Sequence, residues 1–228
     1  MRRARFHMQV GAALALLCAC DHNATTTPTS TGTIVGSGVI VSQSRAVAGF
    51  GAVTVTGPLR LVIEQAGSPS LVVTADDNVI PLVQSEVRSG RLVLGFAANT
   101  SLTRISDVVC RLAMSEVRDV EASGAARVEM SGIGAGPLGI HLSGATIGSA
   151  GGTAEELTLE VSGASRWTAS ELRTRTVTAR VSGASYGLVR ASDSLVADVS
   201  GVSVLEYFGD PNVVPRVDGL SVVRRVGP

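Results

Sequence analysis

Three titratable residues recur at one phase of a repeat. Glu121, His141 and Glu160 lie 20 and 19 residues apart, each two residues before a serine. Two carboxylates flanking a sugar bond are the machinery of glycoside hydrolysis. On neighbouring parallel strands, however, Glu121 and Glu160 would stand about 9.6 Å apart, with His141 on the strand between them. That separation is at the upper limit for inverting hydrolysis, so solvated cross-strand pairing is the favoured interpretation.

The serines of the repeat could also be read as nucleophiles. Ser-Gly-Ala or a close variant begins at five positions with spacings of 20, 19, 20 and 18 residues: Ser123, Ser143, Ser162, Ser182 and Ser200. A nucleophilic serine occurs once in an enzyme, whereas this signal recurs five times. The repeated serines are therefore predicted to be architectural, with glycine allowing a sharp bend and serine hydroxyls satisfying freed backbone groups.

Three other motifs give weak chemical signals. Asp76-Asp77-Asn78 follows an apolar run, and its spacing matches turn chemistry better than a calcium loop. Gly134 to Gly139 reads Gly-x-Gly-x-x-Gly, but a strand pattern follows where a nucleotide site needs a helix. Cys110 lies in an alternating apolar run and is interpreted as a small buried hydrophobe. We predict no catalytic residue, no metal site and no cofactor.

The positions around the repeated serines alternate between apolar and polar residues. The residue before each serine is apolar in all five copies: Ala122, Leu142, Val161, Val181 and Val199. Alternation at period two indicates a strand with one buried face. Because the same phase returns every 18–20 residues, successive strands should run in the same direction. This predicts an all-β protein, a parallel β-helix or solenoid with coils of about 18–20 residues.

The chain divides by pattern into four parts. Residues 1–19 have an arginine-rich start and a short apolar stretch ending in "LCAC", which resembles a bacterial lipobox and predicts a lipoprotein signal peptide with a lipid anchor on Cys20. Residues 20–35 form a Thr/Ser/Pro tether. Residues 36–116 are β-rich but irregular, as starting coils or a separate small β domain, and residues 117–228 carry the repeat.

Composition restricts the partners. Formal net charge is zero, no basic run stands out and aromatic residues make up 3% of the chain, so nucleic acid is not expected. Trp167, Tyr186 and Arg166 lie four or five residues after a repeat serine. On adjacent coils they could form one binding patch, because aromatic residues and arginine dominate binding energy at interfaces. Core filling is the alternative for the aromatic residues.

The sequence resembles the bacterial head GIN domain family, labelled as auto-transporter adhesins. The resemblance rests on the stretch from Arg45 to Phe96, including Phe50, Gln65-x-Gly67 and Asp76-Asp77-Asn78, and on the repeated Ser-Gly-Ala-Ser. It implies a right-handed β-helix on the cell envelope and no established activity.

These observations predict a non-enzymatic, lipid-anchored cell-envelope protein whose β-helical surface binds or adheres to a protein, a glycan or another copy of itself. It would face the periplasm or the outer surface. A carbohydrate-active β-helix enzyme, a polysaccharide lyase or hydrolase, is the alternative function.

Overall fold

The computed structural model describes residues 33–228, so the predicted signal peptide and Cys20 lie outside the described residues. The first part of this range contains nine strands: β1 Thr33–Val35, β2 Ile40–Arg45, β3 Ala52–Thr56, β4 Leu59–Gln65, β5 Ser70–Asp76, β6 Val83–Arg88, β7 Arg91–Phe96, β8 Ser101–Thr103 and β9 Val108–Met114. A single 3₁₀ turn, η1 Ile80–Leu82, lies between β5 and β6. Within residues 33–228, no helix has the length and apolar character needed to cross a bilayer.

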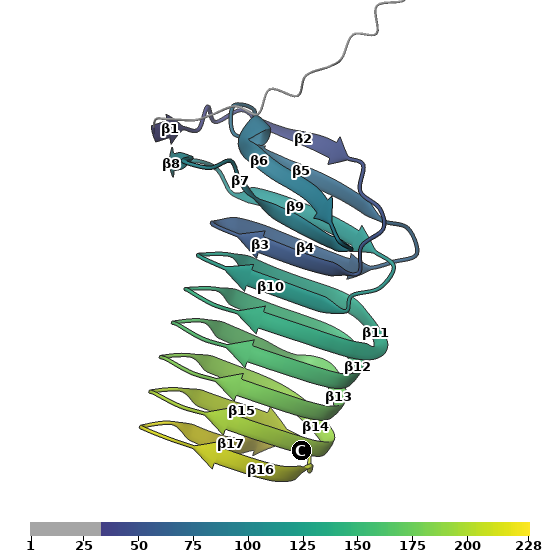
Figure 1. Ribbon diagram of the computed structural model, residues 1–228, viewed down its shortest axis with the longest axis vertical. Helices are drawn as coiled ribbons and strands as arrows, with labels where there is room; N and C mark the ends of the chain where they lie inside the picture. The colour runs from purple at the N-terminus through teal and green to yellow at the C-terminus, as the bar shows by residue number, and fades with distance from the viewer. Residues whose placement is uncertain (1–32) are drawn as a thin grey trace, which may run out of the picture.

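The repeat supplies the remaining eight strands: β10 Asp119–Ser123, β11 Arg127–Leu142, β12 Ile147–Val161, β13 Arg166–Val181, β14 Tyr186–Val199, β15 Val204–Phe208, β16 Asn212–Val217 and β17 Val222–Gly227. Strands β10 to β14 lie one below another in Figure 1, and β15 and β16 both pair with β14. We call one repeat, from its serine to the next, a rung. Equivalent residues of successive rungs pair in parallel, as in the series Leu142, Val161, Val181 and Val199. The prediction of an all-β chain with parallel repeat strands is therefore confirmed.

The irregular N-terminal strands adjoin the repeat directly. Strand β3 pairs in parallel with β10, and β4 pairs in parallel with β11. Antiparallel pairing occurs only near the start of the described chain, between β2 and β5, β5 and β9, and β6 and β7. The result is one open, mostly parallel sheet of fifteen strands.

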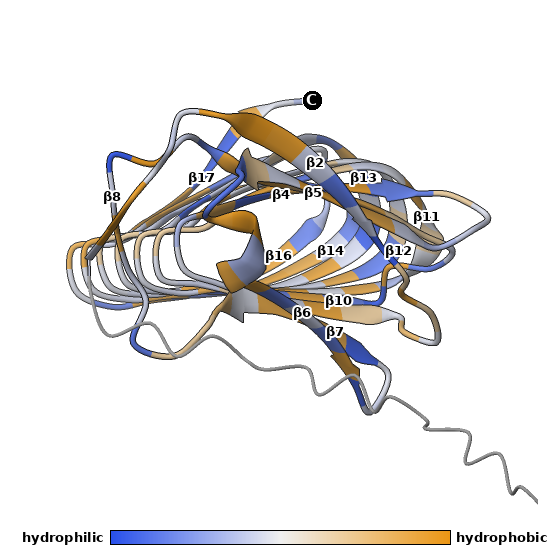
Figure 2. Ribbon diagram, turned by 90° about the horizontal axis from the view of Figure 1, so that it is seen from above, coloured by the Kyte–Doolittle hydropathy of each residue, from blue (hydrophilic) through white to orange (hydrophobic). Residues whose placement is uncertain are grey.

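The inward columns of the rungs form a single core. Residues that alternate toward the interior are buried from Phe50 to Leu205 in one continuous apolar cluster. Viewed along the stack, successive rungs lie over one another, so inward positions of one rung are stacked on the equivalent positions of the next (Figure 2). Cys110 is buried in this core, as predicted, and burial raises the pKa of its thiol to about 11.

The Ser-Gly corners stack without space for a side chain. Gly163 has φ = 76°, and a Cβ there would lie 2.5 Å from the carbonyl oxygen of Gly144. The second serine of Ser-Gly-Ala-Ser, and not the first, forms the buried ladder. Ser165 Oγ donates to Gly144 O and accepts a hydrogen bond from the Thr146 N–H, while Ser185 Oγ donates to Gly163 O.

The Asp76-Asp77-Asn78 motif forms a turn, as predicted, and fastens the first strands to the sheet. The buried Asp76 carboxylate accepts hydrogen bonds from the backbone N–H groups of Gly38 and Ser106, both at 2.8 Å, and from the Ser106 hydroxyl. Asn78 donates to Val35 O at 2.8 Å. In the part of the chain that the structure describes, no group of three His, Cys, Asp or Glu side chains is placed to hold a metal ion.

The final strands of the stack, β16 and β17, each have one open edge. Asp218, Leu220 and Val222 donate their backbone N–H groups to the preceding rung. In this segment the backbone N–H groups of even-numbered residues thus bond to the sheet. The backbone groups of odd-numbered residues point away from it, toward the open edge. Pro215, in β16, is odd-numbered and has no N–H to offer there. This is the position at which a sheet tolerates proline.

Candidate binding surfaces

The strands of each rung display two outward surfaces of different character. One surface carries the outward residues of β13, β14, β15 and β17, and we call it the aromatic–arginine face: Arg166, Tyr186, Leu188, Arg190, Glu206, Phe208 and Arg224. The other carries the outward residues of β10 to β13, and we call it the charge column: Glu121, His141, Glu160 and Arg180. Both surfaces are positioned by the same parallel register.

Two of the three residues predicted as a binding patch lie together on the aromatic–arginine face. Arg166 and Tyr186 are register partners on β13 and β14, and the guanidinium carbon lies 4.5 Å from the centre of the tyrosine ring. The Tyr186 hydroxyl donates to Glu206 at 2.5 Å, and Arg224 Nε donates to the same carboxylate at 2.8 Å. Burial, followed by the bond to Glu206, raises the pKa of Tyr186 to about 12.

The third predicted patch residue, Trp167, is not on this surface. Its side chain is fully buried, so its assignment to an exposed patch is wrong. Its register partners on the adjacent strands are Gly148 and Gly187. A Cβ at Gly148 would lie 2.8 Å from the indole, so the glycine makes room for the large ring inside the core. The sequence signal for a buried ring was the glycine that occupies the position equivalent to the tryptophan in both the preceding and the following repeat.

Aromatic and cationic groups continue along the same face. The Arg190 guanidinium carbon lies 4.8 Å from the centre of the Phe208 ring, and Arg190 Nε donates to Ser170 O at 3.0 Å. Among the residues of the aromatic–arginine face, three are arginines and one, Glu206, is acidic. Arginines held against aromatic rings are preorganised donors, because less side-chain freedom is lost when they bind.

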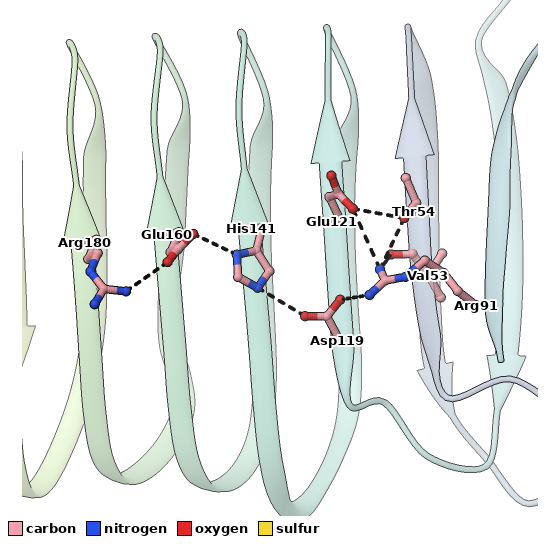
Figure 3. Close-up of polar contacts among 8 residues, drawn as sticks. All are labelled: Val53, Thr54, Arg91, Asp119, Glu121, His141, Glu160 and Arg180. Atoms are coloured by element: carbon pink, nitrogen blue, oxygen red, sulfur yellow. Dashed lines mark hydrogen bonds and ion pairs between the residues drawn. The ribbon is translucent and has the colours of Figure 1, made fainter. Parts of the chain in front are cut away.

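The charge column is paired within itself (Figure 3). His141 lies between Glu121 and Glu160 in the register, as predicted, but its two nitrogens reach Glu160 Oε2 at 3.1 Å and Asp119 Oδ1 at 3.2 Å. Asp119 also accepts from Arg91 at 2.6 Å, and Glu160 accepts from Arg180 at 3.0 Å. Each charge in this row therefore has an opposite neighbour.

The electrostatics of the charge column do not resemble those of a glycosidase. The hydrogen bond with His141, and then that with Arg180, lowers the pKa of Glu160 below its ordinary value. A general acid needs a carboxyl pKa raised toward neutrality. Glu121 accepts from Thr54 and lies 3.9 Å from Arg91. A hollow of about 440 Å³ is lined by residues of the charge column and by the neighbouring Asp119 and Arg91, which makes it a polar, ion-paired surface.

A third feature was not anticipated from the sequence. A groove of about 620 Å³ follows the stacking direction and is lined by residues of five consecutive rungs, from Ala135 to Asp210. We call it the axial groove. It lies where the strand pairing becomes irregular, between Thr168 and Thr176 of β13 and around Gly151 of β12. The repeat columns lose their alignment there, so the sequence carried no direct signal of a groove.

Comparison with known proteins identifies the family. The chain belongs to the head GIN domain family, described as "putative auto-transporter adhesin", whose model matches residues 49–211. The family predicted from the sequence is thus confirmed. Among curated proteins none is similar to the chain.

Solved structures with the same fold share little sequence. A "putative adhesin" from Bacteroides fragilis is 19% identical with a TM-score of 0.66, covering 85% of this chain and 100% of its own. A "putative adhesin" from Parabacteroides distasonis is 18% identical with a TM-score of 0.58, covering 86% and 100%. A "putative lipid binding protein" from the same organism is 18% identical with a TM-score of 0.53, covering 86% and 100%. At these identities the likeness establishes the fold alone.

Proposed function

We propose that the protein is a non-enzymatic, lipid-anchored component of the bacterial cell envelope that binds or adheres to a partner through its stacked strands. In this proposal the rungs form a right-handed parallel β-helix with an irregular N-terminal start. The family description as auto-transporter adhesin supports an envelope location and a role in adhesion.

The aromatic–arginine face is the observation that carries the binding role. It is a flat sheet surface on which tyrosine, phenylalanine and leucine alternate with arginines. Aromatic residues and arginine are enriched at the energetic centre of protein interfaces relative to ordinary surface. The charge column, whose charges neutralise one another, offers no comparable surplus for a partner.

The binding role predicts that attachment depends on Arg166 and Tyr186, the two predicted patch residues that lie on this face. In Arg166→Ala/Tyr186→Ala, affinity for the native envelope fraction should fall roughly 30-fold, the loss expected for about 2 kcal/mol of anchor contacts. Pull-down titrations measure the loss, and circular dichroism checks that the protein stays β-rich. Trp167 is left intact, because its truncation would open a cavity in the core.

The matched control for this experiment lies on the other surface. His141→Ala/Arg180→Ala removes one ring and one cation from the charge column and should leave attachment within twofold of the wild type. Equal losses for the two double variants, or no loss for the patch variant, would refute the assignment of binding to the aromatic–arginine face.

The lipid anchor follows from Cys20 at the end of the lipobox-like run. One acyl chain gives only marginal membrane binding and several give a stable anchor, so a multiply acylated Cys20 should hold the protein in the membrane fraction. We expect Cys20→Ser to move the protein into the soluble fraction in cell fractionation. Retention of the variant in the membrane fraction would be incompatible with the anchor.

A further inference from the structure

We propose that the axial groove is a binding site for a linear acidic polysaccharide, one whose sugars carry carboxylates. The inference deepens the proposed binding function. The groove adjoins the aromatic–arginine face at Arg190, which belongs to both, but Arg166 and Tyr186 do not line it. It rests on the shape of the groove and on the charges that line it.

The shape suits a chain more than a small ligand. Residues from five consecutive rungs line the groove. Four intervals of about 4.8 Å give it a length of roughly 19 Å along the stack. Its volume of about 620 Å³ falls in the range of ordinary ligand sites. An extended polymer of several units could lie along it and contact every rung.

The charged side chains in the groove that have no Asp or Glu partner are arginines. Arg175 is neutralised by Glu155 at 3.0 Å and Asp193 at 3.8 Å, and Asp210 is paired with Arg225 at 3.0 Å. Among residues 33–228, no Asp or Glu carboxylate lies within 4.0 Å of Arg173 or Arg190.

The side chains of these two arginines differ in how firmly they are held before a ligand binds. Arg190 is held in place by the Phe208 ring, by Ser170 O and by Pro228 O at 3.5 Å, so its remaining N–H groups are oriented before a ligand arrives. Arg173 is exposed on the adjacent strand. Guanidinium groups bind carboxylates through two parallel hydrogen bonds. The groove therefore presents two anion-binding groups beside a surface whose other charges are satisfied.

The direction of the groove favours a polysaccharide over an acidic peptide. A peptide gains most of its affinity for a sheet by adding as a strand to an exposed edge. The axial groove runs across the strands, so a peptide lying in it could not form that ladder. Sugar hydroxyls, in contrast, can bond the irregularly paired backbone and the Thr153 and Ser192 side chains that line the groove.

The test measures binding of hexagalacturonate to the full chain by isothermal titration calorimetry. Arg173→Glu should weaken binding at least tenfold, and raising the salt concentration should weaken binding to the wild type. Arg216→Glu is the matched control. It makes the same change of charge at an exposed arginine outside the groove whose nearest carboxylate is 4.0 Å away, and it should change the affinity less than twofold.

Four results would overturn the proposal: no binding of hexagalacturonate, equal weakening by Arg216→Glu, equal binding of the uncharged cellohexaose, or equal binding of hexaglutamate. The last result would identify the groove as a site for acidic peptides. None of them would alter attachment through Arg166 and Tyr186, so failure of this inference is distinguishable from failure of the proposed function.

Discussion

At the scale of single residues, the buried carboxylate of Asp76 connects separate segments of the chain. Asp76 accepts three hydrogen bonds from two segments, around Gly38 and Ser106, that are distant in sequence. The backbone N–H of Ser106 contributes most to lowering the pKa of Asp76 below its ordinary value. Its charged form is therefore favoured in the folded protein, and it ties the first strands to the sheet.

This predicts a specific loss of stability in acid. Because the folded-state pKa is lower than the unfolded one, Asp76 stabilises the fold above about pH 4, and the contribution disappears as pH falls through the folded pKa. Thermal melting of the wild type and Asp76→Asn should differ clearly at pH 7, and the difference should shrink between pH 4 and pH 2. A difference that stays constant over this range would contradict the account.

At the scale of the strand, one column faces the core and the next faces solvent. Val161 is buried between Leu142 and Val181, while Thr158 on the same strand is exposed. We expect Val161→Asp to lower the free energy of unfolding by roughly 3–5 kcal/mol, because it leaves a charge unpaired in the core. Thr158→Asp should change it by about 0.5 kcal/mol or less. Urea denaturation compares them, and equal effects would be incompatible with the register.

The strands of the repeat could be predicted because the same pattern of apolar and polar residues occurs in each copy. The equivalent positions Leu142, Val161 and Val181 are apolar in each copy. Parallel pairing requires such residues to recur at the same position of each repeat. Trp167 was misplaced because its position relative to the serine was considered without the glycines of its own column. Gly148 and Gly187 are separated from it by 19 and 20 residues and carry the missing information.

Other features had no sequence signal of this kind. The antiparallel pairing of β2, β5 and β9 belongs to the unrepeated part, where no column constrains the register. The axial groove joins residues such as Arg173 and Arg190, which are 17 apart, whereas the repeat serines are 18–20 apart. Rung lengths vary in the irregular segments, so aligning residues on the serines does not bring these two together.

At the scale of the whole molecule, the stack ends in strands with one unpaired edge. Among residues 33–228, strand β16 pairs only with β14, and β17 pairs only with β15. Large apolar side chains are exposed in these final strands and the turn between them, including Leu220 at 80% and Val214 at 57%. An exposed apolar edge strand is a hazard for pairing between chains. Pro215 removes one of the hydrogen-bond donors that such pairing would use.

Restoring the missing donor should promote self-association. Pro215→Val adds an N–H to the open edge, and we expect faster growth of light scattering and thioflavin fluorescence than in the wild type. Arg216→Val adds a side chain of the same kind one position along without adding a donor, and it controls for surface hydrophobicity. If both variants associate equally, the missing hydrogen at Pro215 has no protective role.

The parallel register has a further consequence for how such a chain could change in length. Each rung pairs at equivalent positions with the rung before it and with the rung after it. A duplicated or deleted repeat would therefore leave the remaining rungs paired in register. Growth by template is also how fibrils propagate. Such pairing would start at the open edge, where Pro215 lacks the backbone N–H that an added strand would use.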